Sequence, residues 1–588
     1  MDGETEVRGR VAELERLFGD PGDPANPVGG AAFLAADARE EPLAAAEALL
    51  ERFGLNAEFV PCELGGRLVD LDTLARVVRV VFRRDAALGL GYGYANFQAA
   101  VVLWADGDRG QRQTAARLLL AGRRLAAAYP ELARGSNFLA NELTARPAED
   151  GPGVRLSGRK ESLTNVERAD GLVLFARTGE GRSSHSVLLV DRSGLPPGRV
   201  AGLPRRRTPG VRSCLVAGIE FTDCPVPAGA LVGGPGRGLE LALRVFPVIR
   251  SVGPSVALGC ADTALRTAVA CAVDRGVVGR PGQDTDGPQP ASHARSTLVG
   301  AFVDLLMCDC LALVATRAVH LLPADSGLYA AAVKYLLPQL LTDTLYELST
   351  LLGAEFHTQD GVYGAFAKSV RDLPMIGLGA AGSAACRATV VPQLPRLARE
   401  SWFRDPEPPD GLFRLEAGGL PPLDLGRLTP AAGGDPLAAS LAAAAPPEAA
   451  DDPGGRPAEL NALLTAELSR LRDGCAALDL DGRSALADPR GRALADRYAL
   501  VLTGAACLGV WKRQRARGTG FLADPAWLTA ALTRLVRRLG LPAPDSAADH
   551  EGPLLAEVLA RFHGHRSYDL YDTPLTGGTT THGDGRNS

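Results

Sequence analysis

The spacing of the hydrophobic positions changes twice along this chain. Before residue 130 these positions recur at helical intervals, and Gln111 to Ala128 has the composition of a helix that Pro130 ends. Long helical stripes return at 251–274, 297–322 and 328–353. Between the two helical blocks lie short β-like runs, separated by turns rich in Gly, Pro and Arg: Val154–Leu156, Leu172–Phe175, Ser186–Val190 and Val216–Phe221. The pattern predicts an α+β protein that is mostly α, with a helical block, a small β block and a second helical block.

A segment of different composition follows the second helical block. Residues 404–457 are crowded with Pro, Ala, Gly and Asp, which predicts a linker or an irregular wrapping segment. Helical signals then resume: Asp524 suits an N-cap, Pro525 suits the first helical position, and Gly540 follows the last turn. The Thr- and Gly-rich end is expected to be disordered. The predicted parts are an N-terminal helical domain, a β-barrel-like domain, a four-helix bundle, a linker, a C-terminal helical domain and a disordered tail: 1–127, 128–235, 236–403, 404–457, 458–566 and 567–588.

Composition and charge exclude several classes of protein. The 588 residues carry 63 Lys and Arg against 68 Asp and Glu, and a net charge of −5 argues against a nucleic-acid binder driven by bulk charge. The N-terminus is charged and lacks an apolar signal core. The longest apolar stretch, 301–322, is interrupted by Asp304, Asp309 and Arg317, so we interpret it as a buried bundle helix and not as a membrane span. We therefore expect a cytoplasmic protein without nucleic-acid or membrane partners.

The residues by themselves define no reaction centre. Ten cysteines include no C-x-x-C pair, and the eight histidines show no helical metal spacing, so no metal site is predicted. The chain has no G-x-S-x-G nucleophile motif. Gly377 to Gly382 matches G-x-G-x-x-G, but helical sequence flanks it on both sides, which is not the context of a dinucleotide loop.

Several short strings resemble, in order, motifs of the acyl-CoA dehydrogenase family over roughly residues 45–400. Glu131 to Asn137 stands where the family has T-E-P-x-x-G-S-D. Residues 156–160 resemble L-x-G-x-K, and 162–165 resemble W-x-T-N. The other similar strings are a V-P-x-x-x-G-G turn at 60–66, Pro209 to Ser213, Ile219 to Pro227, Leu231 to Gly233, the bundle-helix start Arg250 to Leu265, Arg275 with Gly279, Leu352 to Ala354, and Arg371-Asp372. The C-terminal extension and Ser184-His185-Ser186 resemble the longer, acyl-CoA-oxidase-like branch of lipopeptide and polyketide pathways.

The resemblance implies a flavoprotein oxidoreductase that acts on an acyl thioester, either acyl-CoA or an acyl-carrier protein, in fatty-acid or secondary metabolism. In this family a carboxylate removes the α-proton while FAD takes the β-hydride. The resemblance assigns FAD contacts to four residues: Ser136, Thr164, Arg275 and Gly353. Arg275 matches an arginine that reaches the cofactor pyrophosphate, and the Gly353 loop approaches the FAD of a neighbouring subunit.

The chain departs from the family at the position of the catalytic base. Counted from Arg371-Asp372, the family's glutamate falls on Ala380, and a slip of one residue gives Ala381. The alternative site, immediately before Arg250, is Ile249. Alkyl side chains cannot accept a proton, and loss of a general base costs about 10²–10⁴-fold in rate. Ser162 and Pro130 also replace the family's tryptophan and threonine. The catalytic residue is therefore unassigned, and we expect weak or absent dehydrogenation of simple acyl-CoAs.

Three hypotheses follow, and they leave open whether the chain is a catalyst. In the first, the chain is a flavin oxidoreductase whose base comes from elsewhere in the sequence, for which the candidates are Glu355, His357 and Asp360. In the second, it is a non-catalytic subunit that pairs with an active paralogue. In the third, it is a flavin-dependent monooxygenase of the same fold. The helices expected at 297–322 and 328–353 have little polar surface, and relatives pack this face against another subunit. We expect a homodimer or homotetramer, or a heteromer with a paralogue.

Overall fold

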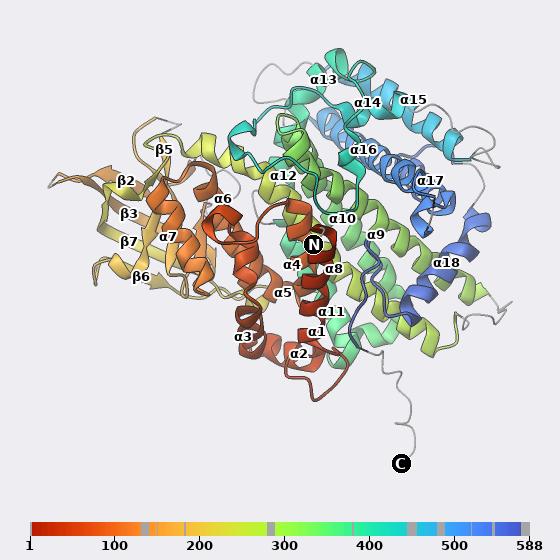
Figure 1. Ribbon diagram of the computed structural model, residues 1–588, viewed down its shortest axis with the longest axis horizontal. Helices are drawn as coiled ribbons and strands as arrows, with labels where there is room; N and C mark the ends of the chain where they lie inside the picture. The colour runs from red at the N-terminus through yellow and green to blue at the C-terminus, as the bar shows by residue number, and fades with distance from the viewer. Residues whose placement is uncertain are drawn as a thin grey trace.

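Helices build most of the molecule, and one β-sheet lies at one end of it (Figure 1). The computed structural model describes residues 3–129, 131, 140–149, 151–181, 184–278, 289–378, 382–443, 456–478, 488–518, 520–543 and 547–577. The helical blocks and the β block follow one another along the chain in the predicted order. The predicted fold class is confirmed.

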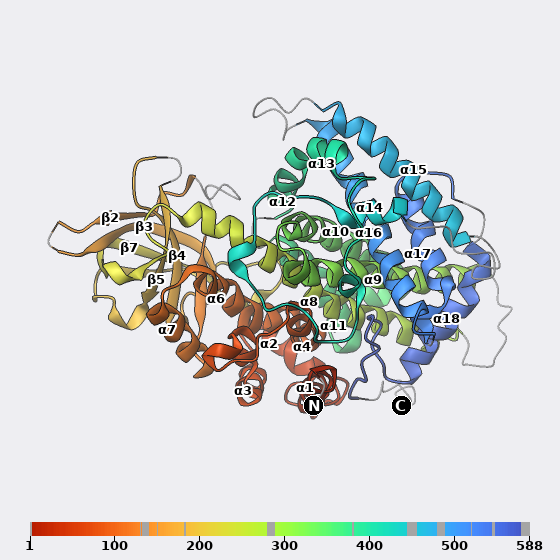
Figure 2. The same cartoon turned by 45° about the horizontal axis from the view of Figure 1, so that its top comes forward.

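The N-terminal helices pack between the sheet and the bundle (Figure 2). They are α1 Gly3–Phe18, α2 Gly30–Ala38, α3 Ala44–Phe53, α4 Leu71–Arg84, α5 Ala86–Leu88, a π-helical turn Gly89–Tyr94, α6 Ala95–Asp106 and α7 Arg109–Leu120. The expected helix to Ala128 is wrong beyond residue 120. Gly122 adopts φ 73° after the last turn, and Leu125–Ala128 forms strand β1 in parallel with β4. Pairing with a distant strand overrides the helical propensity of this Ala-rich segment.

The β domain is one mixed eight-stranded sheet with the order β6-β7-β3-β2-β4-β5-β8, to which β1 adds alongside β4. Its strands are β1 Leu125–Ala128, β2 Thr144–Pro147, β3 Gly153–Thr164, β4 Gly171–Arg177, β5 His185–Asp191, β6 Val200–Leu203, β7 Val216–Pro227 and β8 Leu231–Val232. The four predicted β runs lie within β3, β4, β5 and β7. Mostly antiparallel pairing excludes a doubly wound parallel sheet in the described residues.

Long helices follow the sheet and form the centre of the molecule. They are α8 Gly238–Asp274, α9 Gln289–Leu321, α10 Ser326–Leu352 and α11 Gly361–Leu378, followed by the shorter α12 Ser383–Val390 and α13 Leu394–Glu400. The three predicted apolar stripes fall on α8, α9 and α10. Three helices of the described chain, α8, α9 from Ser292, and α16 Pro489–Arg515, are long and apolar enough to cross a membrane by length and composition. In α9 the apolar window is wholly buried inside the protein.

The C-terminal helices cover one side of this bundle (Figure 2). They are α14 Pro436–Ala443, α15 Arg456–Ala476, α16 Pro489–Arg515, α17 Pro525–Arg538 and α18 Ala547–His563. As predicted, Asp524 caps α17, because its carboxylate accepts a 2.7 Å hydrogen bond from the Ala526 amide. Helices α16, α17 and α18 all contact α9. The apolar surface of α9, which we expected to meet another subunit, is therefore covered within the chain.

The expectation of a disordered tail from residue 567 is wrong for residues 567–577. Tyr568 and Leu570 are buried, and the Leu570 amide donates a 2.9 Å hydrogen bond to Asp309 on α9. The Asp569 carboxylate lies 3.4 Å from the Arg79 guanidinium and 3.3 Å from that of Arg83, both on α4. These arginines lie on one face of a helix with mostly apolar neighbours, and their charges require a buried counter-ion. Residues 578–588 lie outside the described chain.

Candidate functional site

The structure brings together several of the strings that were singled out in the sequence. Lys160, the lysine of the L-x-G-x-K string, is fully buried, and its ammonium lies 3.1 Å from the Glu131 carboxylate. Glu131 also accepts hydrogen bonds from the amides of Glu142 and Leu143, at 2.7 and 2.9 Å. Burial lowers the pKa of Lys160 to about 8, although Glu131 opposes the shift. The ion pair ties the start of the T-E-P-like segment to strand β3.

A second contact joins the Pro209–Ser213 string to Arg371-Asp372. The Val211 amide donates a 2.8 Å hydrogen bond to the Asp372 carboxylate. A Cβ atom on Gly210 would lie 2.5 Å from the Arg371 carbonyl oxygen, so only glycine allows this close approach. Lys368 lies 2.6 Å from the carboxylates of both Asp372 and Asp85. This network fixes the β-domain loop onto α11 and the N-terminal helices.

Two of the four expected FAD residues lie together at the ends of α8 and α10. The exposed Arg275 donates hydrogen bonds to the carbonyls of Leu351 and Leu352, at 2.8 and 2.9 Å. Gly353 follows directly, with φ 58° and ψ −127°, and no atom lies within 4 Å of the position of an added Cβ. The loop therefore needs glycine for its backbone conformation and leaves open space above it.

Thr164 lies at the end of β3, where it pairs with Val216 of β7. Its hydroxyl is half-buried and makes no hydrogen bond to any described residue. The next residue, Asn165, has φ 62°, and its amide donates to the Gly91 carbonyl, which fixes the turn. A hydroxyl without a partner and an open glycine loop fit a flavin dinucleotide, whereas Arg275 already donates two hydrogen bonds within the protein. Ser136 lies outside the described residues.

Of the positions expected to hold a base, the one that the structure describes carries an alkyl side chain. Ile249 is 3% exposed on α8, and its carbonyl accepts a hydrogen bond from the Tyr94 hydroxyl. Ala380 and Ala381 lie outside the described residues. The candidates Glu355, His357 and Asp360 precede α11, whose 18 residues span about 27 Å. They lie at the opposite end of this helix from Leu378.

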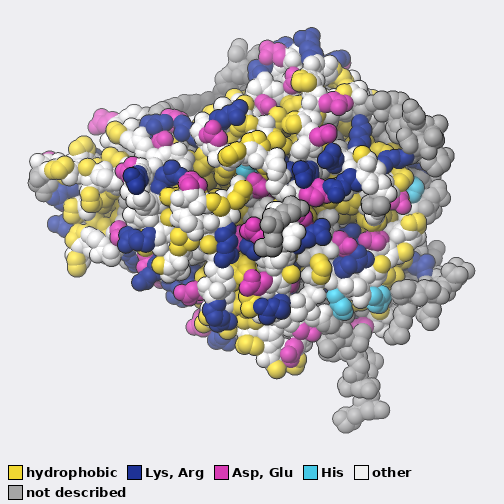
Figure 3. All heavy atoms as spheres, in the orientation of Figure 1, with side chains coloured by type: hydrophobic (Ala, Val, Ile, Leu, Met, Phe, Trp, Pro, Cys, Tyr) yellow, Lys and Arg dark blue, Asp and Glu magenta, His cyan; other side chains and the backbone are white. Residues whose placement is uncertain are grey.

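One charged cluster at this end of the bundle was not identified from the sequence. Arg250 on α8, Lys334 on α10 and Cys386 on α12 are buried, with exposed fractions of 4%, 3% and 0%. The sequence signal was two cations within otherwise apolar helical stripes. Among the described residues, no group of three or more His, Cys, Asp and Glu side chains is placed to hold a metal ion. Basic and acidic side chains alternate over the visible face, without a single-sign patch (Figure 3).

The amino-acid sequence is similar to those of several known proteins. No family model matches the chain. Over 229 residues, or 39% of its length, it is 30% identical to human short-chain specific acyl-CoA dehydrogenase, of which it covers 55%. Over 238 residues it is 28% identical to cyclohex-1-ene-1-carbonyl-CoA dehydrogenase of Syntrophus aciditrophicus, of which it covers 56%. The chain thus spans about half the length of the curated relatives that it matches.

Solved structures extend the likeness to almost the whole chain. The structure of Bacillus anthracis acyl-CoA dehydrogenase complexed with FAD superimposes with a TM-score of 0.70, at 15% identity and with 96% of each chain covered. The chain therefore has the fold of an acyl-CoA dehydrogenase. FkbI, described as acting in the biosynthesis of the methoxymalonyl extender unit of a polyketide immunosuppressant, gives a TM-score of 0.53 at 21% identity over 65% of this chain. Because coverage with the B. anthracis protein reaches 96% of this chain, the shared fold includes the C-terminal helical domain.

Proposed function

We propose that this chain is an FAD-binding, acyl-CoA dehydrogenase-type protein that acts on an acyl thioester, either acyl-CoA or an acyl-carrier protein, in the tailoring of secondary-metabolite acyl chains. The observation that carries the proposal is the contact between Arg275 and the residues directly before Gly353, which joins two expected FAD residues from different helices. The names of the relatives support the substrate class. The FkbI likeness supports the setting in secondary metabolism.

Four residues of this chain would hold the cofactor: Ser136, Thr164, Arg275 and Gly353. When bound, FAD supplies a hydride acceptor. Thr164 would donate its hydroxyl, which has no partner among the described residues, and the open backbone at Gly353 would allow close approach of the dinucleotide, which in an oligomer comes from a second subunit. Arg275 would act mainly by holding the Gly353 loop in place, because both of its terminal nitrogens bind carbonyls of that loop.

The proposed site has no carboxylate base at either family position. Ile249 and Ala380 offer no proton acceptor, so the isolated chain would dehydrogenate simple acyl-CoAs weakly or not at all. A non-catalytic role beside an active paralogue remains the second candidate function, and the buried alkyl group at Ile249 favours it. Copurification with a base-containing paralogue would support that role, whereas dependence on a flavin reductase would support a monooxygenase.

The first test is the absorbance spectrum of the purified protein. We expect bound oxidised flavin, and we expect Thr164→Val to weaken FAD binding while leaving the fold intact. Thr144→Val on strand β2 is the matched control, because its hydroxyl already bonds to the Ser157 carbonyl. Equal FAD affinity in the two variants would exclude Thr164 from the cofactor site.

The second test restores a base. With FAD and an acyl thioester bound, Ala380→Glu should increase the rate of flavin reduction about tenfold or more. Ala384→Glu, on an exposed position of α12, is the control for added charge. Rapid flavin bleaching by an acyl thioester in the unmodified protein would show that a base lies elsewhere and would refute the vacant-site proposal.

A further inference from the structure

A cavity of about 310 Å³ lies where the N-terminal helix, the end of α16 and the C-terminal segment meet. Residues of α1, of segment 415–416, of α16, of the turn Phe521–Ala523 and of segment 570–572 line it. Its volume falls in the range of about 300–1,000 Å³ that is typical of small-molecule sites. Thr164, Arg275 and Gly353 are not among its lining residues, so it is separate from the proposed cofactor contacts.

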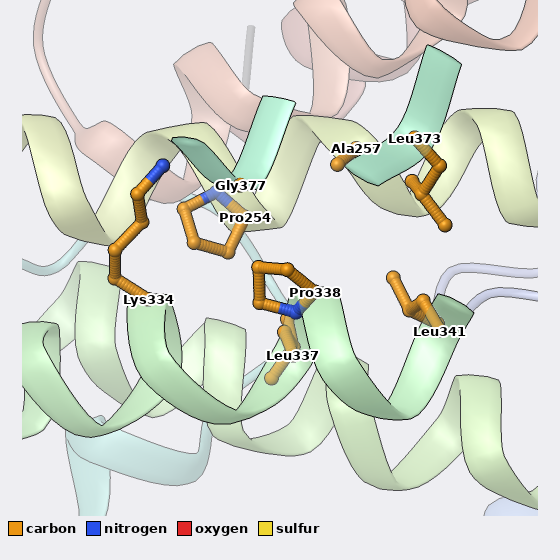
Figure 4. A pocket seen from close by; sticks show the side chains of 8 residues that line it. All are labelled: Pro254, Ala257, Lys334, Leu337, Pro338, Leu341, Leu373 and Gly377. Carbon is orange, nitrogen blue, oxygen red and sulfur yellow. The ribbon is translucent and has the colours of Figure 1, made fainter. Parts of the chain in front are cut away.

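The space between α8, α10 and α11 is much smaller. Lys334, Pro338 and Gly377 are among the residues that line it (Figure 4), and its volume is about 10 Å³. A space of this size has room for about one water molecule. Of the two spaces, only the cavity beside the C-terminal segment can hold an organic ligand.

One buried polar side chain at the larger cavity lacks a partner. Gln514 on α16 is 9% exposed, and its Nε2 atom is buried without a hydrogen-bond partner among the described residues. A buried amide in this state is costly unless water or a ligand satisfies it. Because Gln514 lines the cavity, a molecule bound there can supply an acceptor for this amide.

Two guanidinium groups at the cavity have nitrogen atoms left for a ligand. Arg8 on α1 donates a 2.6 Å hydrogen bond to Glu4 through Nε, while its side chain is 71% exposed. Arg561 on α18 is 2% exposed, and its Nε and Nη1 atoms donate to the Glu557 carboxylate and to two backbone carbonyls. Within the described chain, the Nη2 atom of Arg561 and both Nη atoms of Arg8 donate no hydrogen bond. Both groups can therefore donate to an anionic group.

Two carboxylates at the cavity each keep one oxygen without a hydrogen bond. Glu416 Oε2 and Asp572 Oδ1 are buried and have no hydrogen-bond partner in the part of the chain that the structure describes. Their contacts with cations are long, since Arg414 Nε lies 3.5 Å from Glu416 Oε2 and Arg561 Nε lies 3.6 Å from Asp572 Oδ1. Such oxygens can accept hydrogen bonds from an ammonium group.

Apolar side chains complete the lining of the cavity. Leu415, Leu522 and Phe521 border it together with the ring of Tyr571. The Phe521 ring lies beside a charged group of the lining, with its centre 5.3 Å from the Arg561 guanidinium. The cavity therefore offers hydrogen-bond donors of positive charge, acceptors of negative charge and an apolar wall.

We propose that this cavity is a binding site for a zwitterion with an apolar side chain, that is, for an apolar α-amino acid. The carboxylate of the ligand would meet Arg8 and Arg561, its ammonium group would meet Glu416 and Asp572, and its side chain would pack against the apolar wall. A ligand with a single charge would leave either the donors or the acceptors unfilled. The bound molecule would join α1 to the C-terminal segment and stabilise their contact. The inference does not depend on the proposed function.

The experiment compares three ligands with the same phenyl skeleton by calorimetry on the full-length protein. Phenylalanine carries both charges, 2-phenylethylamine carries only the ammonium group, and 3-phenylpropionate carries only the carboxylate. We expect phenylalanine to bind about tenfold or more tightly than either of the others. Arg8→Met should weaken phenylalanine and 3-phenylpropionate but not 2-phenylethylamine, whereas Glu416→Gln should weaken phenylalanine and 2-phenylethylamine but not 3-phenylpropionate.

Arg112→Met and Glu63→Gln are the matched controls, because they remove the partners of a 2.8 Å ion pair that does not line the cavity. Both should leave all three affinities unchanged. Equal affinities, tighter binding of a singly charged ligand, a preference that survives both cavity variants, or no binding at millimolar concentration would each overturn the proposal. If a cavity variant does not fold, Gln514→Leu replaces it and should weaken phenylalanine binding; unchanged affinity in that variant would also overturn the proposal.

Discussion

Replacement of Asp435 by alanine should separate the C-terminal helices from the bundle. Asp435 is fully buried, and its carboxylate accepts hydrogen bonds from Trp402 Nε1 at 2.8 Å, the Tyr498 hydroxyl at 2.6 Å and the Tyr329 hydroxyl at 3.1 Å. It also accepts a 3.1 Å bond from the Ala438 amide as the N-cap of α14. Tyr329 belongs to α10 and Tyr498 to α16, so one carboxylate connects the bundle to the C-terminal domain.

The expected cost follows from the donors that lose their acceptor. Each buried donor left without a partner costs about 1–3 kcal/mol, so three side-chain donors together give about 3–9 kcal/mol. Loss of the N-cap adds about 1 kcal/mol. This exceeds a typical single substitution and is a large part of the free energy of unfolding of a domain.

Urea unfolding followed by circular dichroism measures the cost, and hydrogen exchange of the α16 amides shows where it acts. Tyr568→Phe is the control, because Tyr568 is equally buried but its hydroxyl makes only a long 3.4 Å contact with the Val558 carbonyl. We expect that variant to lose less than about 1 kcal/mol. An Asp435→Ala protein within 1 kcal/mol of the unmodified chain, with unchanged α16 exchange, would refute the reasoning.

Three further predictions concern buried charge and backbone strain. Arg317→Met should destabilise the fold by about 3–5 kcal/mol, because it leaves buried Asp72 without its cation, and adding Asp72→Asn should recover much of this in chemical unfolding. Gly353→Ala should lower the free energy of unfolding by about 1–3 kcal/mol, because a φ of 58° is strained for alanine, and it should weaken FAD binding. Unchanged stability and unchanged FAD affinity would place the loop away from the cofactor. The pKa of Lys334 is lowered from 10.5 in the unfolded chain to about 8 in the fold. Between pH 8 and pH 10.5 the unfolded chain therefore binds one more proton than the folded chain, so the stability of the fold rises with pH across this range. In anion-free buffer Lys334→Met should therefore be more stable at pH 7 by up to about 3 kcal/mol, and the advantage should fade from pH 8 to 10.5; a constant difference across this range contradicts the prediction.

Much of the site could be anticipated only through resemblance. The strings around Glu131, Lys160 and Arg371 were recognised in the sequence, yet their mutual contacts became visible only in the fold. Arg275 and Gly353 do lie together, although the contact of Arg275 is with backbone carbonyls. Glu355, His357 and Asp360 remain candidate bases; they precede α11, whose length of about 27 Å separates them from Leu378.

Local sequence determined the elements whose causes are local. The apolar stripes define α8, α9 and α10, short apolar runs between turn residues define the four main strands, and the Asp524–Pro525 pair starts α17. These signals act within a few residues of one another, so they can be read without knowledge of the rest of the chain.

Only the tertiary structure decided the features that depend on distant partners. Residues 125–128 become a strand because β4 lies beside them, and residues 567–577 are ordered because Arg79 and Arg83 need the carboxylate of Asp569. Arg250 and Lys334 meet although they belong to different helices. Helix propensity and hydrophobic periodicity depend on residues that are close in sequence. Strand pairing and charge compensation depend on residues that only folding brings close in space.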